Sequence, residues 1–203
     1  AQRFTCASCH PDGRADGLTW TFVHVRDGFR RRNTRDLRGG VAQTAPFRWS
    51  GHDAELADFV REEVTGLLGG PAPTQEQNEA LQAAVQALPS PPNPFRRPAG
   101  THTEAARRGQ LLFTGKGGCS GCHAGSHFGG TGAWASVGTT PEGLQADIPH
   151  LRGVYDSAPF LHDGRAATLE EIFSRHNPQQ RHGGAHLLSP QELADLVQYV
   201  REL

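Results

Sequence analysis

All four cysteines of the 203-residue chain fall in two copies of one motif, Cys-x-x-Cys-His. The copies are Cys6-Ala-Ser-Cys9-His10 and Cys119-Ser-Gly-Cys122-His123. Two thiols one helical turn apart can reach the two vinyl groups of one porphyrin, and the next histidine then lies under the iron. The motif therefore predicts two covalently attached haem c groups, each with its motif histidine as the proximal iron ligand.

Cys-x-x-Cys pairs also occur in redox-active dithiols and in zinc sites, and two pairs could form one four-cysteine zinc site. That interpretation gives no role to the histidine after each pair. It also requires the two pairs to meet across 113 residues of sequence. The use of every cysteine in the same frame favours haem attachment and leaves no cysteine for a disulfide bond.

The second axial ligand of each iron cannot be methionine, because the sequence contains none. Histidine, tyrosine, lysine, water and an open site remain. His24, fourteen residues after His10, and His176, in a segment expected to be helical, are the candidates, although either could equally be a hydrogen-bonded core residue. Six other histidines are interpreted mainly as surface residues: His52, His102, His127, His150, His182 and His186.

The composition limits how these residues can be positioned. Hydrophobic residues make up only 36% of the chain, beside 25 glycines and 14 prolines, so we expect a thin apolar core partly filled by the porphyrins. The net charge of −1 argues against a nucleic-acid-binding protein. No apolar run approaches the roughly 20 residues of a membrane-spanning helix, so no span is expected.

The sequence repeats itself at an offset of 113 to 115 residues. Residues 45–51 (APFRWSG) match residues 158–164 (APFLHDG), and the apolar pattern of residues 74–88 matches that of residues 189–203. An internal repeat of this length predicts an all-α fold of two cytochrome c-like haem domains related by duplication, with long loops. The expected domains are residues 1–92 and residues 93–203, joined by a proline-rich linker.

Three helices are expected to frame the haem sites. Thr74 and Ser189 each begin a capping box ahead of apolar residues at helical spacing. A helix over residues 103–113, capped by Thr103, precedes the second motif, although Gly109 weakens this prediction. Only five residues precede Cys6, so we expect the matching front helix of the first domain to be missing, as in a fragment of a longer chain.

Residues 148–172 (IPHLRGVYDSAPFLHDGRAATLEEI) resemble the C-terminal haem domain of the bacterial dihaem cytochrome c peroxidase and MauG family. The segments Asn33-Thr-Arg-Asp-Leu-Arg-Gly and Phe47-Arg-Trp49-Ser-Gly extend the resemblance into the first half. It covers nearly the whole chain, and the Pro-Phe-x-His-Asp-Gly-Arg motif with two Cys-x-x-Cys-His motifs is specific.

The resemblance implies roles for single residues. In the family, the distal ligand of the C-terminal haem follows the His-Asp-Gly histidine by fourteen residues, where this sequence has His176. A distal histidine of the N-terminal haem lies in a loop after the first motif, at the place of His24. Trp49 matches a tryptophan that relays electrons between the haems, and Asn33 matches a ligand of an interface calcium ion.

The sequence departs from the family at the N-terminal haem. The peroxidases place a glutamate over this haem well downstream of the tryptophan, but the corresponding place here holds Gly69 and Gly70. Glu62 and Glu63 are the nearest acids and are the candidates for the catalytic acid–base role, with Trp49 as the catalytic electron relay. Two neighbouring acids on a helix could instead form a solvated face.

Two functions remain open from the sequence. We expect single-electron transfer between two haems, within a longer extracytoplasmic or periplasmic protein that has a redox partner protein or a fused redox domain. The alternative is an enzyme, either a peroxidase that reduces hydrogen peroxide at the N-terminal haem or a MauG-like oxidase. The location follows from haem c attachment outside the bacterial inner membrane, and a homodimer is expected from the peroxidase relatives.

Overall fold

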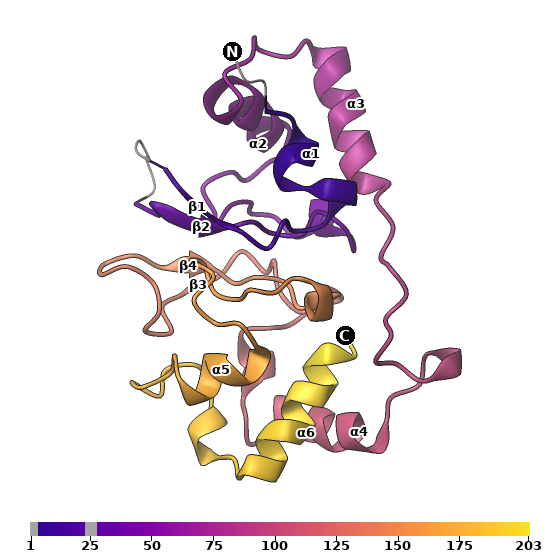
Figure 1. Cartoon of the computed structure of the whole chain (residues 1–203), viewed down its shortest axis with the longest axis vertical. Coiled ribbons are helices and arrows are strands. Elements are labelled where there is room, and N and C mark those ends of the chain that lie inside the picture. Colours follow the sequence, from indigo (N-terminus) through magenta and orange to yellow (C-terminus); the bar gives the residue numbers. More distant parts are fainter. Residues whose placement is uncertain (1–3, 23–27) are drawn as a thin grey trace.

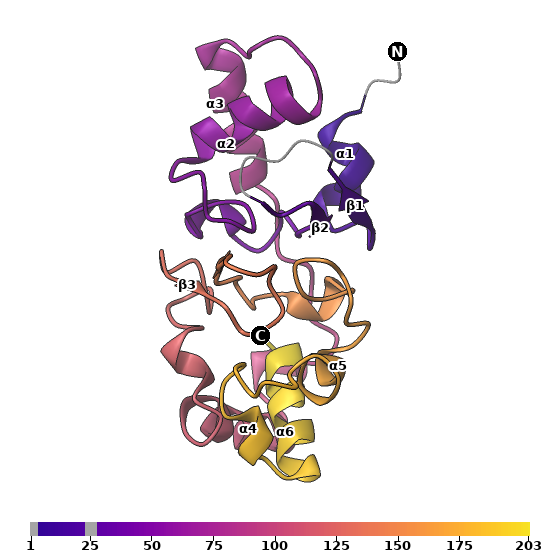
Figure 2. The ribbon, with the colours of Figure 1, turned by 90° about the vertical axis from the view of Figure 1, so that its left-hand side faces the viewer.

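The computed structural model describes residues 4–22 and 28–203. Figures 1 and 2 show an elongated molecule in which the helices of the first half gather at one end and those of the second half at the other. The α-helices of the described residues are α1 (Cys6–Cys9), α2 (Leu56–Glu62), α3 (Gln75–Gln86), α4 (Glu104–Thr114), α5 (Leu169–Ser174) and α6 (Pro190–Arg201). A π-helical turn, Glu63–Leu67, continues α2.

Four short strands make the fold mostly helical rather than all-α. Strand β1 (Thr19–Thr21) pairs antiparallel with β2 (Arg31–Asn33), and β3 (Trp134–Ala135) pairs antiparallel with β4 (Ala146–Asp147). In Figure 1 the two pairs flank the junction between the indigo-to-magenta half and the orange-to-yellow half. The strands therefore lie where residues from both halves meet.

The three expected helices are confirmed, together with their caps. Thr74, Thr103 and Ser189 precede α3, α4 and α6, and each hydroxyl accepts a hydrogen bond of 3.2–3.3 Å from the backbone N–H three residues later. Each bond satisfies one of the N–H groups that a helix leaves unpaired in its first turn. Local sequence therefore decides where these helices begin.

Gly109 allows α4 and α6 to pack closely. A Cβ atom at this position would overlap the carbonyl oxygen of Asp195 in α6, so no side chain fits between the two backbones. The residue that weakened the sequence prediction of α4 is thus required by the contact that α4 makes.

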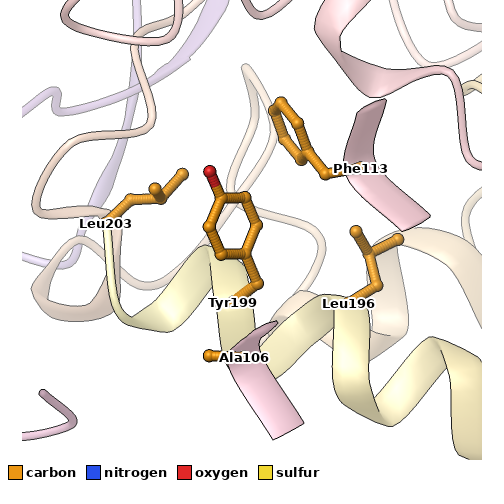
Figure 3. Close-up of a cluster of buried hydrophobic side chains, with 5 residues drawn as sticks. All are labelled: Ala106, Phe113, Leu196, Tyr199 and Leu203. Carbon is orange, nitrogen blue, oxygen red and sulfur yellow. The ribbon is translucent and has the colours of Figure 1, made fainter. Parts of the chain in front are cut away.

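Both clusters of buried hydrophobic residues found in the described part of the chain lie in the second half. The first consists of Ala106, Phe113, Leu196, Tyr199 and Leu203. Figure 3 shows these side chains converging between α4 and α6, and the Phe113 and Tyr199 rings meet edge-on with centres 5.3 Å apart. The second consists of Phe160, Ala166, Leu169, Ile172 and Val197. The thin core agrees with the composition.

Backbone contacts between the halves occur in matched pairs. The Asn33 N–H donates to the His162 carbonyl at 2.6 Å, and the Asp147 N–H donates to the Trp49 carbonyl at 2.9 Å. Asn33 and Asp147 are 114 residues apart, and Trp49 and His162 are 113 apart, so the repeat relates one bond to the other. The Trp49 and His162 rings also meet each other, with centres 6.4 Å apart. An internal duplication would produce such pairs.

The proline-rich linker runs along the outside of the molecule in Figure 1. The Tyr155 hydroxyl donates a 3.1 Å hydrogen bond to the carbonyl of Pro92, which fixes the linker against the second half. Within residues 4–22 and 28–203, no helix has both the length and the apolar character needed to cross a membrane.

Candidate haem sites and the wall between them

Local structure brings the two thiols of each motif onto one turn. The first motif forms α1, and the second forms a 3₁₀ turn over Cys119–Gly121. In both, the histidine N–H donates a 2.8 Å hydrogen bond to the carbonyl of the first cysteine, His10 to Cys6 and His123 to Cys119. None of the four cysteines forms a disulfide bond, so all four thiols are available for thioether bonds to a porphyrin.

Each motif opens onto a cavity. The C-terminal cavity, of about 300 Å³, is lined by Cys119, Cys122 and His123, and its remaining wall is mostly apolar. The N-terminal cavity, of about 630 Å³, is lined by Cys9 and His10. Both volumes are typical of cofactor sites.

The proximal histidine of the C-terminal cavity is arranged as a metal ligand. Its Nδ1 lies 3.1 Å from the carbonyl oxygens of Phe128 and of Pro149, so it donates there and leaves the Nε2 lone pair of His123 for an iron. Burial lowers the pKa of His123, and this effect exceeds the opposing effect of the two hydrogen bonds. The ring is therefore neutral at neutral pH, which is the form that binds metals.

His10 differs from His123 in its hydrogen bonding, because its buried Nδ1 has no hydrogen-bond partner. Burial lowers the pKa of His10, while the charges of Asp16 and Asp36 oppose this effect. The free thiols, the neutral histidines and the cavities beside them fit two covalently bound haems.

The structure brings His182, rather than His176, to the C-terminal cavity. Helix α5 ends at Ser174, so His176 lies beyond its end, and the following Asn177-Pro178 explains why, because a proline disfavours helix in the residue before it. His176 is not among the residues that line the cavity, whereas His182 is.

The rings of His182 and His123 lie with their centres 6.5 Å apart. Metal–imidazole bonds are about 2 Å long, so both rings are within reach of one ion. Burial, followed by the repulsion that a protonated His123 would exert, lowers the pKa of His182 to about 4, which keeps this ring neutral as well. The geometry favours His182 as the distal ligand of the second haem.

The lining of the N-terminal cavity includes the two candidate acids. His24 lies outside the described residues. Glu62, at the end of α2, and Glu63, in the π-helical turn, both line the cavity together with Arg48. The two acids thus lie at the predicted haem site and not on a face remote from it.

Arg48 holds the acidic groups of this cavity together. Its guanidinium donates to the carboxylates of Asp53 and Glu63, and at 3.3 Å to the carboxylate of Glu62. Burial raises the pKa of Glu63, although the charge and hydrogen bond of Arg48 oppose the shift. A carboxyl group with a raised pKa, beside a cavity, can hold a proton for transfer.

One wall is shared by the two cavities. Trp49 lines both, as do the four consecutive residues 33–36. The indole Nε1 donates a 2.9 Å hydrogen bond to the Asn33 carbonyl, and the Arg35 guanidinium lies over the ring, 5.1 Å from its centre. The structure therefore places Trp49 between the two cavities.

Asn33 has a buried side-chain amide that is only partly hydrogen-bonded. The residue is buried, its Nδ2 donates to the Pro159 carbonyl, and its Oδ1 has no partner. Rotation of the amide by about 180° would bring Oδ1 of Asn33, in place of Nδ2, against the Pro159 carbonyl oxygen. A hard cation such as calcium would stabilise this pair of oxygens. Calcium binding stays a prediction that these two oxygens support.

Three residues of the site, Arg35, Arg48 and His182, were not predicted from the sequence. His52 and His186 are exposed, as interpreted, but the other four histidines of that group, His182 among them, are half-buried. A histidine in a glycine-rich stretch carries no local sign of burial. The repeat gives no sign of Arg35 either, because the matching position in the second half holds Pro149.

Known proteins resemble this chain over most of its length. The cytochrome c family model matches residues 106–203. The chain is 31% identical to hydrazine synthase subunit gamma of Kuenenia stuttgartiensis, over 98% of this chain and 72% of that protein. It is 26% identical to the methylamine utilization protein MauG of Methylorubrum extorquens, over 85% of this chain and 62% of that protein.

Solved structures agree with these relatives. A structure of Kuenenia stuttgartiensis hydrazine synthase superposes with a TM-score of 0.84 at 28% identity, covering 98% of this chain and 81% of that chain. A MauG-like protein associated with microbial copper homeostasis superposes with a TM-score of 0.66 at 20% identity, covering 98% and 82%. The second likeness shows the fold alone.

Proposed function

The chain belongs to the family of MauG-like cytochrome c peroxidases that includes hydrazine synthase subunit gamma, and from this premise we propose that it binds two haems and passes single electrons between them. Each bound haem supplies an iron that takes up and releases one electron. The two haem domains, residues 1–92 and 93–203, would be the two halves of an internal duplication.

The shared wall carries this proposal. Two cavities, each with its own Cys-x-x-Cys-His motif, have Trp49 and residues 33–36 in common. An aromatic side chain that borders both sites shortens the path through which an electron must tunnel. The hydrogen bond from Nε1 to the Asn33 carbonyl holds the indole in this position.

The C-terminal site is suited to electron transfer alone. With His123 and His182 both within reach of one ion, the second haem would have no open position for a substrate. Two histidine ligands give a lower reduction potential than a histidine and a methionine, so this haem would be a good electron donor.

Glu63 and Arg48 favour a second candidate function, the reduction of hydrogen peroxide at the N-terminal cavity. The reaction consumes one peroxide, two protons and two electrons and yields two water molecules. Glu63, protonated more readily because burial raises its pKa, would deliver a proton to the oxygen that leaves. Arg48 would keep the carboxyl group in place, and a redox partner would supply the electrons one at a time.

The cellular location of the protein and its binding partners are further proposals. Covalent haem attachment supports a periplasmic or other extracytoplasmic location. The relative named as a subunit of hydrazine synthase supports a redox partner, as a separate protein or a fused domain. A homodimer and binding of calcium stay predictions.

Pulse radiolysis of the oxidised dihaem protein tests electron transfer directly. One electron per molecule is delivered, and absorption follows its passage from one haem to the other. We expect Trp49→Phe to slow the passage about tenfold or more, and Trp134→Phe, which replaces an exposed tryptophan that lines neither cavity, to leave it unchanged. Two haems that exchange no electron in the unchanged protein would exclude the function.

Peroxide turnover separates the second candidate from the first. We expect the N-terminal iron to be high-spin by EPR once its neighbour is reduced, and Glu63→Gln to lower the rate of peroxide reduction at least tenfold. Glu79→Gln in α3 is the matched control, because this glutamate is not among the residues that line the cavity. Two low-spin irons that do not react with peroxide would leave electron transfer as the only function.

A further inference from the structure

The charge beside Trp49 determines how an electron can cross the shared wall. An electron can tunnel through the neutral indole in one step, or the indole can itself lose an electron to one haem and regain it from the other. The second route requires a positive charge to reside on the ring. Contacts of the ring therefore decide between the two routes, and this inference rests on the electron-transfer function proposed above.

Arg35 places a fixed positive charge over the indole. Its guanidinium carbon lies 5.1 Å from the ring centre. Nη1 donates to the carbonyl of Arg48 at 3.1 Å and to the carboxylate of Asp147 at 3.3 Å, so two partners from separate segments fix the side chain. In a partly buried environment, a cation at this distance strongly disfavours a second positive charge on the ring.

Two other contacts of the indole, the His162 ring and the Asn33 carbonyl, do not relieve this repulsion. His162, which meets the ring edge-on, has a pKa lowered by burial and is neutral at neutral pH, so it offers no negative charge. The acceptor of the indole N–H is the Asn33 carbonyl, an oxygen that cannot take up a proton. An oxidised Trp49 could not lose its proton to this partner and would keep its charge.

Asp147 offsets the charge of Arg35 only in part. Its carboxylate is fully buried, its Oδ1 has no partner, and its Oδ2 meets Arg35 at the long distance of 3.3 Å. Its backbone N–H, in contrast, contacts the Trp49 carbonyl directly. Asp147 therefore positions Trp49 through its backbone, while its side chain faces the cation.

We propose that Arg35 is a positioning residue that keeps Trp49 reduced and uncharged, so that electrons cross between the haems by tunnelling through the indole. Without this guanidinium, a strong oxidant can remove an electron from the indole itself. Arg35 thereby protects the tryptophan from oxidation without closing the path between the haems.

Flash photolysis of the dihaem protein tests this role with a defined oxidant. A photogenerated ruthenium(III) polypyridyl complex removes one electron from the protein and is itself reduced to ruthenium(II). A tryptophan radical is then measured by transient absorption and by EPR after freezing. We expect Arg35→Gln to raise the yield of this radical at least tenfold over the unchanged protein, and Arg35→Gln/Trp49→Phe to abolish the increase.

Two further variants separate charge from structure. Arg35→Lys keeps the positive charge and should keep the radical yield low, whereas Asp147→Asn removes the opposing charge and should not raise it. A radical yield in Arg35→Gln equal to that of the unchanged protein would overturn the proposal, as would abundant Trp49 radical in the unchanged protein. Arg35→Lys yielding as much radical as Arg35→Gln would assign the effect to packing and also overturn it.

Electron passage between the haems, measured by pulse radiolysis on the same samples, reports on the proposed function separately. If the unchanged protein passes no electron between its haems, the proposed function fails whatever the radical yield. If it does pass electrons and Arg35→Gln forms no additional radical, only the role of Arg35 fails.

Discussion

At the scale of single residues, the identity of the distal histidine in the C-terminal cavity has the clearest consequence. We expect His182→Ala to convert the second haem to a high-spin form, because the ring that faces His123 is removed. Optical and EPR spectra of the oxidised protein would show the change, and added imidazole should reverse it.

His176→Ala is the matched control for this substitution. His176 lies beyond the end of α5 and outside the cavity lining, so we expect its spectra to stay low-spin. The opposite pattern, with a high-spin haem in His176→Ala alone, would restore the ligand that spacing from the His-Asp-Gly motif predicted.

These two histidines show what sequence can and cannot predict about the site. The proximal ligands follow from a five-residue motif, because one turn of backbone fixes the thiols and the histidine together. The distal ligand depends on where a helix ends and how the next loop folds back, and Asn177-Pro178 changes both. Trp49 follows from the resemblance, but its contact with Arg35 does not, since that contact depends on how the two segments pack.

At the scale of elements, the contact between α4 and α6 depends on the absence of one side chain. We expect Gly109→Ala to lower the free energy of unfolding by about 1–3 kcal/mol, even though alanine favours a helix, because a Cβ atom there would collide with the backbone of Asp195. Chemical denaturation of the haem-loaded protein measures this loss.

Gly121→Ala provides the comparison. Gly121 ends the 3₁₀ turn of the second motif and does not line the cavity, and no atom lies within 4 Å of the position that an alanine methyl group would take there, so its substitution should change stability little. Equal effects of the two substitutions would show that helix propensity, and not the close approach of α4 to α6, controls the outcome.

The helices themselves illustrate how far local patterns reach. Their starts were predictable, because Thr74, Thr103 and Ser189 cap them through contacts three residues away. The four short strands could not be predicted in this way. Strands β2 and β4 are positioned by pairing with β1 and β3 across loops and by hydrogen bonds between the halves. Such pairing leaves little periodicity in segments of two or three residues.

At the scale of the whole molecule, Asn33 links the two halves and provides a test for calcium. Its side chain meets Pro159 and its backbone meets His162, so an ion bound there would join both halves. At a calcium concentration 100 times the Kd, binding would add about 2.7 kcal/mol. For a domain of this size, that corresponds to a rise in Tm of roughly 5–10 °C.

Removal of calcium by a chelator should reverse this rise. Asn33→Ala should be insensitive to both treatments, and Asn33→Asp, which keeps an oxygen ligand, should respond as the unchanged protein does. A Tm that ignores calcium in the unchanged protein would contradict the prediction.

The uneven distribution of buried hydrophobic residues also bears on how the protein matures in the cell. Both hydrophobic clusters of the described chain belong to the second half, so that half has a nucleus of its own before any cofactor arrives. The first half is built around a cavity of about 630 Å³ and has no comparable nucleus among its described residues. We expect proteases to digest the first half until its haem is attached. Only chains that have received this haem would then persist in the cell.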